Sequence, residues 1–435
     1  MSASTTSALT NELLQFIERS PSPWHAGANT AAQLMAQGFS PLSERDRWSL
    51  QQGGRYFVTR DDASLIAFVL GSDTVNTGFR IIGAHTDSPG LRVKANGAHD
   101  SAGYLRLATE IYGGPILATF TDRDLLLAGR VIVRDSSAVD GVKTRLLRLD
   151  DCLVRLPNLA IHLNRGVNDD GLKIHKHSGL NLLLSTLGEN EQAAQRLRAL
   201  LAEQIGATPE QILSFELCAV DAQAPAYFGA QKEFIASRQL DNLASCHAAT
   251  TALLSVNADA ATPVIALFDH EEVGSESTTG AAGNFLESVL QRIVQSQTSD
   301  GDALARASAA SWHMSADMAH AHHPSHNDCF DGLHQLKANG GIVLKINASQ
   351  RYATNAIGEA FFTQLCEQAG APMQKYVHRA DLACGTTIGP VSAARLGIKT
   401  FDVGTPMWAM HSARESAGAL DHPHYINVMS AFLKG

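Results

Sequence analysis

The sequence lacks a long hydrophobic run, an excess of basic residues and an N-terminal secretion signal. No apolar stretch among its 435 residues reaches the ~20 residues that a membrane-spanning helix needs, so we expect no membrane anchor. The formal net charge of −9 offers no basic surface for nucleic acid or for an anionic membrane. The N-terminal segment has neither a basic head nor a continuous apolar core, which argues against secretion.

Cysteine is scarce and scattered. The six cysteines form no C-x-x-C pair, so the sequence predicts neither a disulfide framework nor a cysteine-zinc site. Reduced thiols of this kind are typical of a cytoplasmic enzyme. The cysteines are Cys152, Cys218, Cys246, Cys329, Cys366 and Cys384.

Apolar runs alternate with stretches of helical periodicity over most of the chain. This alternation predicts an α/β fold with a mostly parallel sheet flanked by helices. No internal repeat and no linker rich in Pro, Gly or Ser divides the chain. Strands are predicted at 64–70, 79–85, 262–270, 341–347 and 398–404, and helices at 9–17, 242–256, 283–297 and 356–370.

One internal stretch follows a different pattern. Between about residues 90 and 231, strand-like runs with hairpin-like breaks dominate, and only 191–206 is strongly helical. We therefore predict a β-rich domain at 91–231. It would be inserted into an α/β domain made of 1–90 and 232–435.

Polar side chains that can bind metal follow four apolar runs of the predicted sheet, and Asp241, in a fifth segment, stands just before a predicted helix. In open parallel sheets the functional crevice lies beyond the carboxyl ends of the strands, so these side chains can meet. A lone residue of this kind is commonly a turn or cap residue, but five such segments together indicate a metal site. Histidine and carboxylate without cysteine suit zinc, or manganese and cobalt in its place. The candidates are His85, Asp87, Asp241, Glu271, Glu272, Asp317 and His411.

Several of these segments resemble the signature motifs of the aspartyl aminopeptidase family. The resemblance runs from "SPSPWHA" near the start to "MHSARE" near the end, which is nearly the whole chain. It implies a dinuclear-zinc metallo-aminopeptidase that removes acidic residues, preferably Asp or Glu, from peptide N-termini. The motifs are "GAHTDSPG", "SRQLDN", "DHEEVGSES", "SADMAHA", "CGTTIGP" and "AMHSARE".

The resemblance also implies which residues hold two zinc ions per subunit, with Co²⁺ or Mn²⁺ as substitutes. His85, Asp241 and Asp317 would hold one ion. Asp241, Glu272 and His411 would hold the other, with Asp241 bridging two metals that lie about 3.5–4 Å apart. A shared carboxylate lowers the repulsion between two neighbouring cations.

Three further residues are expected to act in catalysis. Glu271 would be the general base that takes a proton from the attacking water and passes it to the leaving amine. Asp87, two residues after His85, would accept that ring's other N–H and fix its tautomer. In the family, the insert mediates dimerisation and its histidine reaches the neighbouring subunit's site, so His162 would stabilise the oxyanion in trans. The family assembles into dodecamers built from dimers, which we expect here too.

Substrate contacts are predicted in two places. Lys345 lies in an apolar strand and would pair with the acidic side chain of the substrate, as the family resemblance suggests. The glycine-rich "CGTTIGP" loop, with Gly385 and Thr386, would face the substrate, since glycine lets the main chain approach a ligand. It lacks the Lys-Ser/Thr ending of a phosphate-binding loop.

Five other histidines lie close together around Asp317 but are not expected to ligate metal. The five predicted ligands already satisfy both metals, and surface loops carry histidines freely. Some of the five could line the entrance of the site. They are His313, His320, His322, His323 and His326.

Two other functions remain open. The first is a related dinuclear-zinc carboxypeptidase or deacylase, which would need basic residues to grip a substrate carboxylate. The second is a catalytically inactive scaffold on the same fold, which the intact Glu271 and the five metal ligands disfavour. A metal assay with a panel of aminoacyl substrates would separate the three.

Overall fold

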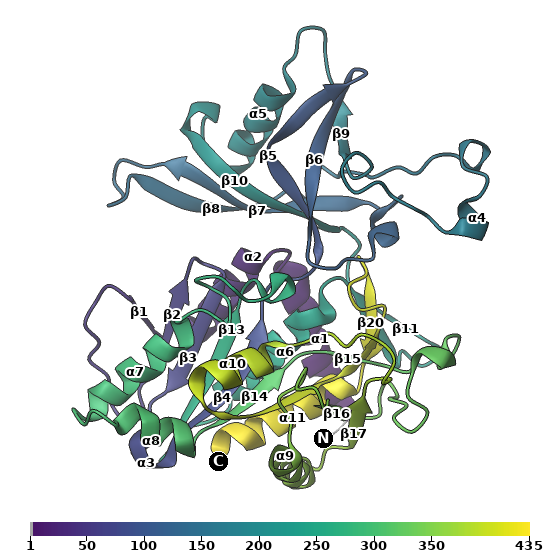
Figure 1. The fold of residues 1–435 in the computed structure, drawn as a ribbon. Coiled ribbons are helices and arrows are strands. Elements are labelled where there is room, and N and C mark those ends of the chain that lie inside the picture. Colours follow the sequence, from purple (N-terminus) through teal and green to yellow (C-terminus); the bar gives the residue numbers. More distant parts are fainter. Residues whose placement is uncertain (1–2) are drawn as a thin grey trace.

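The computed structural model describes residues 3–435, with side chains from Ala8 onward. Figure 1 shows a larger α/β body below and a smaller β-rich unit above it. The body holds two sheets and most of the helices. The upper unit holds the third sheet.

Nine strands form the central sheet of the body. Five of its eight neighbouring pairs are parallel, which confirms the α/β fold with a mostly parallel sheet. The four central strands run in the same direction, so their carboxyl ends share one edge. In sheet order the strands are β1 (Ser40–Leu42), β2 (Arg55–Arg60), β3 (Ser64–Val69), β13 (Thr262–Phe268), β4 (Phe79–His85), β14 (Trp312–Ala316), β18 (Lys399–Gly404), β16 (Ile342–Ile346) and β17 (Met373–Val377).

Helices cover both faces of this sheet. Side chains alternate along β4, so Ile82 and Ala84 join one core cluster while Phe79 and Ile81 join another. The first cluster includes residues of α1 (Ala3–Arg19), α2 (Pro23–Ala36), α6 (Leu240–Leu254), α9 (Ala356–Ala369) and α11 (Asp421–Lys434). The second includes residues of α3 (Thr74–Thr77), α7 (Phe285–Gln297), α8 (Ala303–Ala310) and α10 (Ile388–Leu396).

The upper unit is an antiparallel sheet of six strands with its own apolar core. Helix α5 (Ala193–Ile205) turns Leu197 and Leu201 into this core, as its helical periodicity predicts. The 3-10 helices η1 (Leu117–Phe120) and η3 (Pro209–Gln211) lie in its connections. In sheet order the strands are β8 (Val142–Arg148), β7 (Leu125–Arg134), β10 (Ile212–Asp221), β5 (Gly90–Ser101), β6 (Tyr104–Tyr112) and β9 (Leu182–Thr186).

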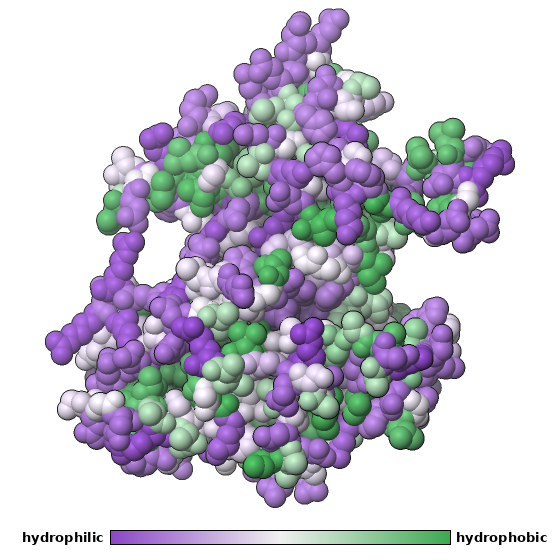
Figure 2. Space-filling view, viewed as in Figure 1, coloured by the Kyte–Doolittle hydropathy of each residue, from purple (hydrophilic) through white to green (hydrophobic). Residues whose placement is uncertain are grey.

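A long connection between β8 and β9 extends sideways from the upper unit (Figure 1). We call residues 157–179 the arm; it contains η2 (Ile161–Leu163) and α4 (Val167–Asp170). Apolar side chains of the arm are exposed, with Leu159 66% and Leu163 75% accessible. Figure 2 shows hydrophobic residues at its end.

A third sheet of five short strands lies in the body beside the central sheet. The turn between its strands β19 and β20 carries His411. Its strand β11 pairs with β12 although it falls inside the range 91–231, so the division of the chain into domains stays a prediction. In sheet order the strands are β11 (Ala226–Phe228), β12 (Phe234–Ser237), β20 (Glu415–Gly418), β19 (Pro406–Trp408) and β15 (Ala319–His320).

All six cysteines are free thiols. Within residues 3–435, no helix combines the length and the apolarity that crossing a membrane requires.

Candidate metal centre

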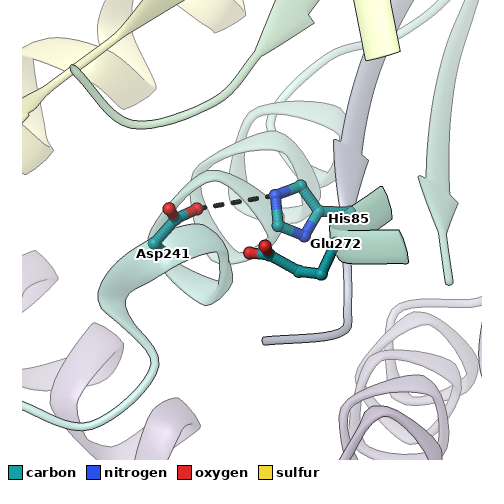
Figure 3. A group of neighbouring side chains, drawn as sticks. All are labelled: His85, Asp241 and Glu272. Atoms are coloured by element: carbon teal, nitrogen blue, oxygen red, sulfur yellow. Dashed lines mark ion pairs between the residues drawn. The ribbon is translucent and has the colours of Figure 1, made fainter. Parts of the chain in front are cut away.

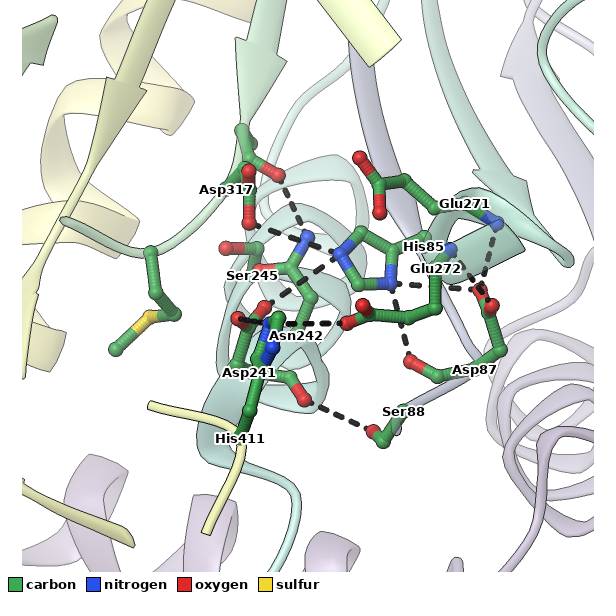
Figure 4. A network of polar contacts seen from close by, with 12 residues as sticks. His85, Asp87, Ser88, Asp241, Asn242, Ser245, Glu271, Glu272, Asp317 and His411 are labelled. Atoms are coloured by element: carbon green, nitrogen blue, oxygen red, sulfur yellow. Dashed lines mark hydrogen bonds and ion pairs between the residues drawn. The ribbon is translucent and has the colours of Figure 1, made fainter. Parts of the chain in front are cut away.

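Five segments that are distant in sequence meet at the carboxyl edge of the central sheet. Strand β4 ends at His85, Asp241 lies in the first turn of α6, and η4 (Glu271–Val273) follows β13. Asp317 comes directly after β14, and His411 lies in the turn between β19 and β20. Figure 4 shows these side chains pointing toward one another.

Asp241 lies between the two histidines. Its Oδ1 is 3.5 Å from His85 Nε2, and its Oδ2 is 3.5 Å from His411 Nε2. His85 Nε2 is also 3.6 Å from Asp317 Oδ1, and His411 Nε2 is 3.5 Å from Glu272 Oε1. The two oxygens of one carboxylate thus each face a different histidine.

Donor atoms are close enough together to surround a cation. The ligand atoms of His85, Asp241 and Glu272 (Figure 3) lie within 4.8 Å of one another, and so do those of His85, Glu271 and Asp317. Two ligands of a tetrahedral zinc with bonds of about 2.0–2.1 Å are themselves about 3.4 Å apart. The nitrogen–oxygen distances of 3.5–3.6 Å are close to this value. Asp241 Oδ1 is buried and has no hydrogen-bond partner, as expected of an oxygen that faces a cation.

Main-chain carbonyl groups orient both histidines. His85 Nδ1 is 3.0 Å from the carbonyl oxygen of Asp87, and His411 Nδ1 is 3.1 Å from that of Gly114. When each Nδ1–H donates to its carbonyl, each Nε2 is left with its lone pair facing the carboxylates. The carboxylate Oδ1 of Asp87, which we expected to hold His85, lies slightly farther from Nδ1, at 3.4 Å.

Asp87 is fully buried, and its carboxylate accepts three hydrogen bonds. It accepts the main-chain N–H of Glu271 at 3.2 Å and that of Glu272 at 3.1 Å. The hydroxyl of Tyr112, in the upper unit, donates to Oδ2 at 2.7 Å. Burial by itself would raise the pKa of Asp87, but hydrogen bonding to His85, to Tyr112 and to the main-chain N–H of Glu272 lowers the pKa.

The two adjacent glutamates lie in a crowded, anionic environment. Burial raises the pKa of Glu271 to about 8, and the charges of Asp317 and Asp87 add to this effect. Burial and then the charge of Asp241 raise the pKa of Glu272 well above its usual value. Divalent cations in this cluster would offset both effects because they stabilise the carboxylate forms.

Lys345 lies at the end of β16 with its ammonium group turned toward the cluster. It donates to the carbonyl oxygen of Met318 at 2.9 Å and to Asp317 Oδ2 at 3.3 Å. Its Nζ is also 5.2 Å from the centre of the Tyr352 ring. The side chain is 3% exposed, so a buried cation stands next to one of the candidate metal ligands.

The "CGTTIGP" segment leads into the first turn of α10 and is exposed at Gly385 and Thr386. The hydroxyl of Thr386 donates to the carbonyl oxygen of Arg351 at 3.2 Å. A Cβ atom at Gly385 would meet nothing within 4 Å. The loop therefore leaves open space next to the segment that carries Tyr352.

His162 lies apart from these residues. It is the middle residue of η2 and is exposed on the arm. None of the groups that could hold a metal in the described part of the chain includes His162 or any of the five histidines around Asp317.

Sequence reasoning missed three contributors to the site. Glu415 accepts the main-chain N–H of Asp241 at 3.0 Å and that of His411 at 2.7 Å. Tyr112 and Gly114 orient Asp87 and His411 from the upper unit. In the sequence, Glu415 could have been noticed as the glutamate of "MHSARE". Gly114 could have been noticed as one of the paired glycines that follow a strand in "EIYGGP".

A cluster of histidines and carboxylates at the carboxyl edge of a largely parallel sheet defines a metal-dependent hydrolase. The chain belongs to the family described as aminopeptidase I zinc metalloprotease (M18), whose pattern matches residues 16–433. It is therefore a zinc aminopeptidase. A probable M18 family aminopeptidase 2 of Pseudomonas paraeruginosa is 45% identical over 429 residues, covering 98% of this chain and 97% of that protein.

Solved structures agree with this assignment. Ape4, in a cryo-EM structure of its complex with Nbr1, matches with a TM-score of 0.94 and 37% identity. The match covers 99% of this chain and 86% of that one. The dodecamer of mApe1 from S. cerevisiae matches with a TM-score of 0.86 and 26% identity, over 98% of this chain and 96% of that one.

Proposed function

We propose that this zinc aminopeptidase uses two metal ions per subunit and prefers peptides with N-terminal Asp or Glu. The observation that carries the proposal is the position of Asp241, with one oxygen toward His85 and the other toward His411. His85, Asp241 and Asp317 would hold one zinc. Asp241, Glu272 and His411 would hold the other, and Co²⁺ or Mn²⁺ could substitute.

Bound zinc would supply Lewis acidity, which lowers the pKa of a water molecule and polarises a carbonyl group. Glu271 accepts the proton of the attacking water and transfers it to the leaving amine. Its position beside His85 and Asp317 supports this role. The hydrogen bond from its N–H to Asp87 holds the segment in place.

Asp87 acts through its neighbours. The loop that begins at Asp87 keeps the Nδ1 proton of His85 engaged, so that Nε2 is available for metal. Its carboxylate also anchors the N–H groups of both Glu271 and Glu272. Residue Asp87 thereby holds the proposed general base and two proposed metal ligands in place, through its carboxylate and its main-chain carbonyl.

Selectivity for acidic N-termini requires a cation near the side chain of the substrate, because burying a carboxylate without a partner is costly. Lys345 is such a cation, and its proximity to Asp317 places it next to the metal cluster. The loop with Gly385 and Thr386 would form the opposite wall, since it has open space at Gly385.

The active enzyme is proposed to be a homo-oligomer, a dodecamer built from dimers through the insert. The exposed apolar side chains of the arm support this, because Leu159, Ile161 and Leu163 would be covered by another subunit. His162 would then stabilise the oxyanion in the neighbouring site. A cytoplasmic location stays a prediction that the free cysteines support.

The proposal is tested with purified protein treated with chelator and then given Zn²⁺, Co²⁺ or Mn²⁺ in turn. Hydrolysis of Asp-, Glu-, Leu- and Ala-nitroanilides is measured alongside metal content. We expect two equivalents of metal per subunit and the highest kcat/KM with Asp or Glu. One equivalent of metal in the fully active enzyme would overturn the dinuclear assignment, and equal rates on all four substrates would overturn the acidic preference.

A further inference from the structure

Glu415 links two of the segments that carry proposed metal ligands. It opens β20 and is 1% exposed. Its Oε1 accepts the N–H of His411 at 2.7 Å and its Oε2 accepts the N–H of Asp241 at 3.0 Å. We propose that Glu415 is a positioning residue of the metal centre, whose single carboxylate fixes the separation of Asp241 and His411. This inference rests on the proposed dinuclear site.

Both segments need such a restraint because their main chains are unusual. His411 has φ of 69° and Ala409 has φ of 54°, and Gln239, just before Asp241, has φ of 55°. Residues other than glycine rarely adopt positive φ, and they keep it only where surrounding interactions hold them. The two main-chain N–H groups that donate to one buried carboxylate provide that restraint.

The carboxylate of Glu415 has no other evident side-chain partner. In the described part of the chain it forms no ion pair with Lys, Arg or His, and its hydrogen bonds come from the N–H groups of Asp241 and His411. A buried carboxylate is costly unless hydrogen bonds or nearby cations compensate it. Both N–H groups that satisfy Glu415 belong to proposed metal ligands, which is what a positioning role requires.

A matched control exists in the same region. Asp421 is also 1% exposed and also accepts two main-chain N–H groups, from Asn339 at 2.7 Å and from Gly341 at 2.8 Å. Neither donor belongs to a proposed metal ligand. Asp421→Asn therefore reports the general cost of removing a buried carboxylate that accepts two hydrogen bonds.

The experiment compares Glu415→Gln with Asp421→Asn in the full-length oligomer. A glutamine oxygen can accept only one of the two N–H groups, and its NH₂ group would oppose the other. We expect Glu415→Gln to weaken the more weakly bound metal by about 10- to 100-fold, measured by equilibrium dialysis with Zn²⁺. The visible absorption of the Co²⁺-loaded protein should change as well, whereas Asp421→Asn should keep wild-type affinity and spectrum.

Where Glu415→Gln does not fold, Glu415→Asp is measured in its place, because a shorter side chain keeps the charge but cannot reach both donors. Wild-type metal affinity and Co²⁺ spectrum in the Glu415 variant would overturn the inference, as would equal loss in Asp421→Asn. A wild-type chain that takes up one metal or none would instead overturn the proposed dinuclear function.

Discussion

The hydroxyl of Tyr112 donates a 2.7 Å hydrogen bond to Oδ2 of Asp87, from the upper unit to the base of the metal cluster. Tyr112 ends β6, and the carbonyl of Gly114, two residues later, accepts the hydrogen bond of His411 Nδ1. The candidate metal centre is therefore assembled by both units of the chain. The upper unit does more than extend the surface available for assembly.

We predict that Tyr112→Phe lowers both kcat/KM and metal affinity by roughly tenfold. Burial, followed by the charge of Asp87, raises the pKa of Tyr112, so its hydroxyl remains a donor at all working pH values. Without that donor, the buried Asp87 holds His85 less firmly. The control is Tyr104→Phe, at an exposed tyrosine of the same strand. Equal kinetics and metal binding in the two variants would contradict the prediction.

The two adjacent glutamates should respond differently to the same substitution. Glu271→Gln should keep most of the metal and lose activity by about 10²- to 10⁴-fold, because the proposed general base is removed. Glu272→Gln should also release metal, because the charge of a ligand is lost. Metal content and kcat are measured for both, with the exposed Glu276→Gln as control. If metal loss were equal at positions 271 and 272, the division of roles would be wrong.

Much of the fold could be predicted because the strands are continuous apolar runs with clear ends. The convergence of His85 and Asp317 could be predicted too, since parallel strands place their carboxyl ends at one edge. The contact between Glu415 and Asp241 could not, because it joins positions 174 residues apart through the direction of one side chain. The hydrogen bond of Tyr112 to Asp87 could not be predicted for a similar reason. Periodicity predicts that a strand residue is buried, but it does not predict which group its hydroxyl contacts.

The arm should deliver His162 to another subunit, and complementation tests this directly. His162→Ala and Glu271→Gln proteins are each expected to be nearly inactive. When they are dissociated, mixed and reassembled, some sites combine an intact Glu271 with an intact arm, so partial activity should return. Mixing His162→Ala with a His162→Ala/Glu271→Gln double variant should restore nothing. Mixed oligomers that stay inactive in the first mixture would place His162 outside the neighbouring site.

Low pH should destabilise the α/β body, because the body contains a buried pair of histidines away from the proposed metal ligands. His247 Nδ1 lies 2.9 Å from His422 Nε2. Burial, helped by the charge of Arg19, lowers the pKa of His247 to about 4. The unfolded chain binds this proton near pH 6.5 and the folded chain does not, so the free energy of unfolding falls as the pH drops from about 6.5 to about 4.

For His247 the loss would total roughly 3 kcal/mol by pH 4. His247→Asn should therefore flatten the fall of Tm between pH 6.5 and 4, measured in chelator so that metal release does not contribute. His177→Asn, at an exposed histidine of the arm, is the control. An unchanged slope in His247→Asn would show that this pair does not set the acid limit.

Substitution of Lys345 tests the proposed preference for acidic N-termini, and the contacts of Lys345 show what else must be measured. Its ammonium group contacts Asp317 and the carbonyl of Met318, so it could support a metal ligand as well as read the substrate. A charge-assisted contact to a buried carboxylate is worth roughly 1.5–3 kcal/mol, or about ten- to a hundredfold in rate. Lys345→Met should lower kcat/KM for Asp- and Glu-nitroanilides by that factor relative to Leu- and Ala-nitroanilides. Metal content measured on the same samples separates the two roles. If all four substrates lose rate equally while metal is lost, Lys345 serves Asp317 alone, and the donor for the acidic side chain must be sought in the loop with Gly385 and Thr386.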